Sequence, residues 1–379
     1  MNYRFVTGAV LSRSLLSAAL SFAGEFQLLP NRVAAGDVTQ SSVVLWAHSG
    51  VVGAHTFWYR AISVPGSTWL SRSAQVTDPA TPAKALLSEL VPGALYLYGI
   101  QSPNSDFDLG VFRTPHPPGA RHGLRFGVSG DSRGDLAPYP SVANARGRSI
   151  DFFVFLGDGI YADVPSPALM KPQARTLNEF RIKHDEVLSA RLGLNAIADL
   201  RALTATFAVI DDHEVTNDFA GGAHPSSDRR FRNTPGNFIN ETPLFEAGLQ
   251  AFHHFEPIVE RFYGATGDLR TQGKRDLYRL RLFGSDAALI LLDARSFRDQ
   301  PLPPAANPLD PESVAAFLEA SFDPNRTMLG EAQLDRLKSH LLLVQALGIT
   351  WKFVLLPEPI QNLGILGASD RFEGYAAER

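Results

Sequence analysis

The sequence of 379 residues contains no cysteine. Disulfide bonds and thiolate ligands are therefore excluded, and a metal site would have to use carboxylate, histidine, asparagine or tyrosine side chains or backbone oxygens. The net charge of −4 gives no global basic field, which argues against nucleic acid or an anionic membrane as the partner. No apolar run is long enough to form a transmembrane helix in the mature protein.

Several catalytic signatures are absent as well. The segment "GVSGDSRGD", residues 127–135, has glycines and an acid after a predicted strand, but it lacks the Lys-Ser/Thr pair of a P-loop. There is no dinucleotide fingerprint and no Gly-x-Ser-x-Gly nucleophile elbow. A reaction without a covalent enzyme intermediate is therefore favoured.

The first 27 residues have the pattern of a secretory signal. Arg4 and Arg13 precede a short apolar run, residues 15–23, that is rich in alanine and serine. We expect a periplasmic or extracellular protein on this basis. The alternative is that residues 1–27 form a first amphipathic segment of the mature fold.

The remaining sequence divides into three regions that differ in their residue patterns. Residues 28–115 contain short alternating strands separated by turns, which predicts an all-β sandwich of the fibronectin type III kind. Residues 116–123 form a linker rich in proline and glycine. Residues 124–379 alternate strands with helical patterns, including one at 175–203, and this predicts an α/β domain.

Acidic residues follow three apolar strands of the predicted α/β domain. They are Asp131, Asp158 and the pair Asp211–Asp212. Ligands of open α/β sheets lie beyond the carboxyl ends of the strands, so we expect these carboxylates to converge. Because like charges repel, one or two metal ions between them are the expected neutralising partner. The alternative is that each acid caps a following helix.

Two short strings sharpen the prediction of a metal site. Tyr161 stands three residues after Asp158, and a phenolate is a hard oxygen donor suited to ferric iron, although a loop tyrosine often only packs. In "DDHEVTND", residues 211–218, His213 could be a metal ligand, a general acid or a phosphate contact. Asn217 offers a neutral carbonyl ligand.

"GDGIYAD" and "DDHEVTND", in this order after a predicted β-sandwich, resemble the PhoD-like alkaline phosphatases and phosphodiesterases. These belong to the calcineurin-like metallophosphoesterase superfamily. "RVAAGDVTQSSVVLWAHS", "LLDARSFR" and "DRFEGYAAER" resemble further landmarks, so the resemblance covers nearly the whole chain. It implies hydrolysis of phosphate mono- or diesters by a metal-bound hydroxide at a dinuclear site, with Fe(III) plus Ca(II) or another divalent cation.

The resemblance also implies residue roles. Asp158 would bridge the two metals, Tyr161 would bind the ferric ion, and Asp212 or Asn217 would bind the second metal. His213 would contact the phosphate and protonate the leaving group. Asp131 would take the place of a first-strand ligand that is a cysteine in the best-known form of the family.

Arg133 is a candidate phosphate contact, together with Ser132, and Asp135 is a less favoured ligand. The loop at 218–238 would either face the substrate, as a lid for example, or be a surface insertion.

The sequence departs from the family pattern at its C-terminal end, where the later metal ligands of the family would be expected. It has no Gly-Asp-x-His motif, and we expect the other histidines, such as His253, His254 and His340, to be structural. A missing C-terminal part is therefore expected. Two alternatives stay open: a purple acid phosphatase, which should carry Gly-Asn-His where this chain has "DDHE", and a non-catalytic binding protein with a degenerate domain.

Overall fold

The computed structural model describes residues 29–361 and 372–379. The predicted secretory signal at 1–27 lies outside the described residues. Among those described, no helix combines the length and the apolar character that a membrane span requires.

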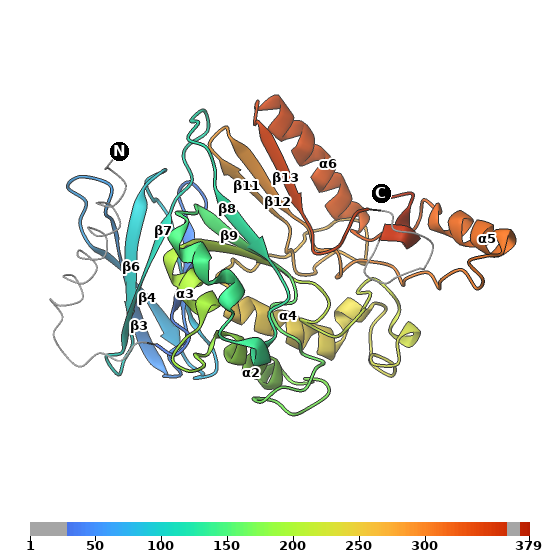
Figure 1. The fold of residues 1–379 in the computed structure, drawn as a ribbon, viewed down its shortest axis with the longest axis horizontal. Helices are drawn as coiled ribbons and strands as arrows, with labels where there is room; N and C mark the ends of the chain where they lie inside the picture. The colour runs from blue at the N-terminus through green and yellow to red at the C-terminus, as the bar shows by residue number, and fades with distance from the viewer. Residues whose placement is uncertain (1–28, 362–371) are drawn as a thin grey trace.

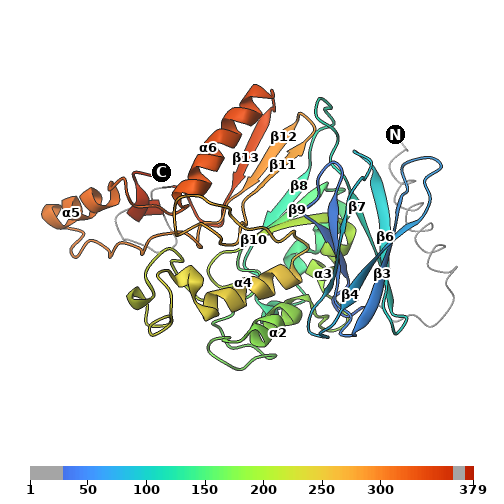
Figure 2. The same ribbon diagram turned by 180° about the vertical axis from the view of Figure 1, so that it is seen from behind.

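The strands form three sheets (Figures 1 and 2). A six-stranded sheet has the order β5-β2-β1-β10-β9-β8, namely Ala83–Leu87, Val43–Ala47, Val33–Gly36, Ala205–Val209, Phe152–Leu156 and Phe126–Ser129. A four-stranded sheet has the order β4-β3-β6-β7, namely Leu70–Val76, Gly53–Ala61, Leu95–Gln101 and Phe107–Arg113. A three-stranded sheet has the order β11-β12-β13, namely Arg279–Phe283, Ala287–Leu291 and Trp351–Leu355.

Five α-helices accompany these sheets in the described part of the chain. They are α2 (Leu177–Leu188), α3 (Ala196–Leu203), α4 (Pro243–Phe255), α5 (Pro311–Ser321) and α6 (Glu331–Ala346). The α/β class predicted from the sequence, preceded by a β-sandwich, is confirmed. The single helical pattern at 175–203 is two helices, because Gly193 takes a positive φ of 75° and Asn195 caps the start of α3.

The six-stranded sheet crosses the expected boundary between sandwich and α/β domain. Strand β1 pairs antiparallel with β2 and parallel with β10, where Ala35 lies opposite Ala205. Gly36 permits this approach, since a Cβ atom there would lie 2.7 Å from the backbone oxygen of Thr206. The two predicted domains therefore share one hydrogen-bonded sheet.

Strand β9 lies between two cores. Phe152 and Val154 pack toward the β-sandwich and the three-stranded sheet, and the ring of Phe152 lies 4.4 Å from that of Phe283. Phe153 and Phe155 point to the opposite face, which α2 and α4 cover (Figure 2). This alternation explains the continuous apolar run, which is typical of a parallel strand buried on both faces.

The parallel register of β8, β9 and β10 positions the acids. Phe152 of β9 lies opposite Phe126 of β8 and Ala205 of β10, so the three strands end at one edge of the sheet. None of the described helices begins at Asp131, Asp158, Asp211 or Asp212, and the helix-capping alternative is therefore wrong.

Lys84 ties the sandwich strand β5 to the end of α4. Its Nζ atom donates to the backbone oxygens of His253, Glu256 and Ile258 at 2.7, 2.9 and 2.8 Å. These carbonyls belong to the helix C-terminus and the turn after it, where intrahelical partners are missing and a positive charge is favoured.

We predict that Lys84→Met lowers the free energy of unfolding by about 2–4 kcal/mol, because three part-buried carbonyls lose a charged donor. Lys338→Met is the matched control: the Lys338 side chain is 61% exposed, and its loss should change stability by less than about 0.5 kcal/mol. Denaturant titration measures both, and equal values for the two variants would contradict the prediction.

Candidate metal centre

The site is built on the loops that follow β9 and β10. Gly157 and Asp158 both take positive φ angles, 72° and 51°. A Cβ atom at Gly157 would lie 2.5 Å from the Cβ atom of Asp211, so the two loops touch only because glycine stands there. The left-handed turn directs Asp158 away from the strand axis and toward the neighbouring loop.

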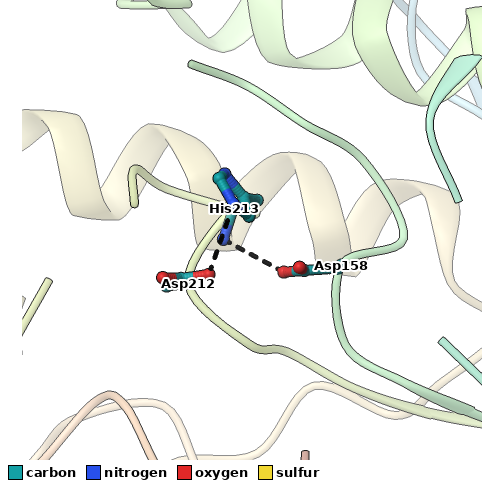
Figure 3. A group of neighbouring side chains, drawn as sticks. All are labelled: Asp158, Asp212 and His213. Carbon is teal, nitrogen blue, oxygen red and sulfur yellow. Dashed lines mark hydrogen bonds and ion pairs between the residues drawn. The ribbon is translucent and has the colours of Figure 1, made fainter. Parts of the chain in front are cut away.

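Asp158, Asp212 and His213 form a group that could hold a cation. One potential ligand atom of each lies within 4.8 Å of the others. Figure 3 shows both carboxylates facing His213, whose backbone N–H donates to Asp158 Oδ1 at 3.3 Å. The Nε2 atom of His213 lies 3.9 Å from Asp212 Oδ1, and the other oxygen of Asp212 accepts from the backbone of Asp218.

The electrostatics of Asp158 fit a bound cation. Burial, together with repulsion from Asp211 and Asp212, raises the pKa of Asp158 to about 7. A cation between the carboxylates would reverse this effect, because it favours the charged forms. Carboxylate, phenol and imidazole donors suit hard or borderline ions.

Tyr161 joins the group to the loop after β8. Its hydroxyl donates to Asp131 Oδ1 at 2.8 Å, and its ring stacks on that of His213 with centroids 4.1 Å apart. Burial and the neighbouring Asp131 and Asp158 raise the pKa of the phenol. Without a cation the phenol therefore keeps its proton and serves as a donor.

Asp163 is a functional candidate that the sequence reasoning missed. Its Oδ1 atom lies 2.6 Å from His213 Nδ1, and its Oδ2 atom accepts from the backbone of Asn217 at 2.7 Å. Burial lowers the pKa of His213, but Asp163, Asp212 and Asp158 outweigh it and raise the pKa to about 9. The sequence offered one signal for Asp163, because it is the last residue of the family-like string "GDGIYAD".

Arg295 is the second residue that was missed. It is fully buried on the segment after β12, and its Nε atom lies 2.6 Å from Asp211 and 2.9 Å from Glu358. Its guanidinium is also 3.5 Å from Asp212. "LLDARSFR" resembled a family landmark, but nothing in that string indicated which acids the arginine would meet.

Two other predicted residues lie at the rim. The Arg133 guanidinium pairs with Asp135 at 2.9 Å, and its Cζ atom lies 5.8 Å from the ring centre of Tyr161. Asn217 is exposed, and its amide donates to Asp218. Their assigned roles stay predictions, as do the ligand roles of Asp131, Asp158, Tyr161 and Asp212 and the catalytic role of His213.

The loop at 218–238 is packed against the Arg295 segment. Gly221 and Gly222 donate to the backbone oxygens of Arg295 and Arg298 at 2.9 and 3.0 Å. A cavity of about 340 Å³ lies beside this loop; its wall includes Asp218, Ser227, Arg229, Arg230 and Gln300.

His253, His254 and His340 lie in helices, as expected. His253 is buried in α4, and burial and nearby cations hold its pKa well below the usual range. His340 of α6 shares a hydrogen bond of 2.9 Å with the hydroxyl of Tyr278.

Residues 128–379 match the family model described as PhoD-like phosphatase. This chain belongs to that family. It is accordingly an alkaline phosphatase D-like phosphoric ester hydrolase, and the family prediction from "GDGIYAD" and "DDHEVTND" is confirmed. No curated protein sequence gives a significant match.

One solved structure agrees with the fold of this family member. A structure described as "Structure of PhoD" is 20% identical and superposes with a TM-score of 0.68, covering 94% of this chain and 69% of that chain. A purple acid phosphatase from yellow lupin seeds is 13% identical with a TM-score of 0.41, covering 69% of this chain and 43% of its own.

We predict that Arg295→Gln lowers the free energy of unfolding of this PhoD-like chain by about 3–5 kcal/mol, because it removes the cation that pairs with Asp211 and one of the two arginines, Arg295 and Arg298, that pair with Glu358. Thermal or denaturant unfolding of the metal-free protein measures the loss.

The matched control for this change is Arg336→Gln. Arg336 pairs with Asp276 at 2.8 Å, but its side chain is 31% exposed, so solvent compensates most of the loss. Comparable destabilisation in both variants would contradict the special position of Arg295.

We predict that Asp163→Asn moves the alkaline limb of the pH–kcat profile to lower pH by a unit or more. Removing the anion lowers the pKa of His213 from about 9 toward 6.5, so a proton donor at this position is lost at lower pH. Asp335→Asn, on an exposed part of α6, is the control that should leave the limb in place. An unchanged limb in Asp163→Asn would exclude His213 as the titrating donor.

Proposed function

We propose that this chain hydrolyses phosphate mono- or diesters at a dinuclear metal site centred on Asp158. The observation that carries the proposal is the convergence of Asp158, Asp212 and His213 at one sheet edge, with Tyr161 and Asp131 on the other side of Asp158. Family membership supports the reaction class. Asp158 contacts both His213 and Tyr161, which suits a bridging ligand.

Asp158, Tyr161 and Asp131 would hold one ion, and Asp158 with Asp212 or Asn217 the other. A pair of hard cations supplies an activated water and charge neutralisation for the phosphoryl group. Fe(III) with Ca(II) or another divalent cation is the proposed pair, supported by the phenol and carboxylate donors.

His213 would deliver a proton to the leaving oxygen, and Asp163 orients its imidazole through Nδ1. This leaves Nε2 near Asp212 Oδ1, 3.9 Å away, where it would face a bound phosphate. Arg133 would contact phosphoryl oxygens from the rim of the site, where its side chain is 39% exposed.

The cavity of about 340 Å³ beside 218–238 supports a substrate-facing role for that loop. We further propose that the protein is exported, supported by the charge and apolar pattern of residues 1–27. Of the two alternatives, the non-catalytic binding protein is an outcome of the experiment below, and the family match favours a PhoD-like phosphatase over a purple acid phosphatase.

We predict that Asp158→Asn lowers kcat/KM by roughly 10³-fold, because the carboxylate shared by both ions is lost. Turnover of p-nitrophenyl phosphate and bis-p-nitrophenyl phosphate, with metal analysis of each preparation, measures it. Asp335→Asn should keep wild-type rates. Wild-type protein that retains no metal and hydrolyses neither ester would identify the non-catalytic alternative instead.

A phenolate-to-iron charge-transfer band that disappears in Tyr161→Phe would support ferric iron in the site. Metal-loaded wild-type protein without such a band would overturn the assignment of Fe(III) and leave the hydrolysis proposal to the ester assay.

A further inference from the structure

Glu214 is fully buried beside the site, although the mechanism gives it no ligand role. Its Oε1 atom accepts from the backbone N–H of Gly159 at 2.6 Å. Its Oε2 atom accepts from the N–H groups of Asp158 and Asp211 at 3.2 and 2.8 Å. One carboxylate therefore binds three backbone donors on two different loops.

We propose that Glu214 is a positioning residue that fixes the loop of Asp158 against the loop of Asp212 and His213, and thereby sets the affinity of the site for its cations. The inference rests on the proposed metal-dependent function and deepens it. Glu214 acts through the backbone of the residues around the site, so it differs from the predicted ligands.

The backbone of Asp158 explains why an anchor, meaning the three hydrogen bonds that the Glu214 carboxylate accepts, is needed. Its φ of 51° lies in the left-handed region, which costs an aspartate about 1 kcal/mol relative to ordinary backbone. The N–H of this strained residue is one of the three that Glu214 accepts. Removing the acceptor would free the turn to relax, and the Asp158 carboxylate would move away from Asp212.

The anchor is also a long-range contact. Asp158 and Gly159 are 56 and 55 residues from Glu214 in the sequence, whereas Asp211 is three residues away. The separation of the two loops is therefore set by one side chain in addition to the sheet register. Because a buried donor without an acceptor is unfavourable, the three bonds are retained together.

Glu214→Gln is the informative variant because it keeps the shape of the side chain. Its single amide oxygen can serve Asp158 and Asp211, but its NH₂ group then faces the N–H of Gly159. One donor is lost while the fold is kept. Changes to groups that orient metal ligands typically lower metal affinity 10- to 100-fold.

Glu256→Gln is the matched control. Glu256 and Glu214 both line the same small cavity, which has a volume of about 30 Å³. Its carboxylate lies 3.7 Å from Arg201 and contacts neither loop of the site. It reports the effect of neutralising a glutamate in this region without touching the anchor.

The experiment is a calorimetric titration with Mn²⁺ alone of three metal-free proteins: wild type, Glu214→Gln and Glu256→Gln. We expect the dissociation constant to rise about 10- to 100-fold in Glu214→Gln only, and excess Mn²⁺ to restore most of its kcat with little change in KM. A wild-type dissociation constant in Glu214→Gln would overturn the inference, as would an equal rise in Glu256→Gln.

Hydrogen exchange of metal-free wild type provides a test that needs no variant. The amides of Asp158, Gly159 and Asp211 should exchange as slowly as those of β9 and β10, and rapid exchange would overturn the anchor even if Glu214→Gln did not fold. Failure of the proposed function is distinguishable, since wild type itself would then bind no Mn²⁺ and hydrolyse no ester.

Discussion

The in-register hydrogen bonding of β9 between β8 and β10 is the constraint on which the site depends. It places the carboxyl ends of three parallel strands at one edge, so the loops that carry Asp131, Asp158 and Asp212 begin side by side. The apolar faces of β9 hold this register, because a slip of one residue would exchange Phe152 and Phe153 between the two cores. Core packing several residues before the strand ends thus sets the positions of the acidic side chains that follow them.

Placing carboxylates together at a part-buried edge is unfavourable, and the fold offsets this in two different ways. The buried guanidinium of Arg295 pairs with the carboxylate of Asp211. Backbone N–H groups are arranged around Glu214, which joins the two loops without adding a ligand. Asp158 has no arginine in such a pair among the described residues; His213 and Tyr161 stabilise its charged form only in part, and burial and repulsion still raise its pKa to about 7. This incompletely compensated carboxylate is the one that faces the predicted cation.

The sequence predicted the parts of the site that follow a local rule. An apolar strand running into an acid marks a sheet edge, so Asp158, Asp212 and His213 could be named without a structure. Asp163 and Arg295 could not, because their partners are 50 and 84 residues away and no spacing rule connects them. The joining of β1 to β10 was equally inaccessible, since the short apolar run of β1 specifies its own strand and not its neighbour.

Asp158 contacts two chemically different halves of the centre. One half holds Asp212 and the imidazole of His213, and the other holds the Tyr161 phenol and Asp131. The halves are joined through the stacked rings of Tyr161 and His213, so a shift of either loop would move both. The two unlike ions that we propose would share the Asp158 carboxylate in this arrangement, and each ion would lower the pKa of the shared ligand for the other. The left-handed backbone at Asp158 is then the feature that puts one oxygen-bearing group within reach of both halves.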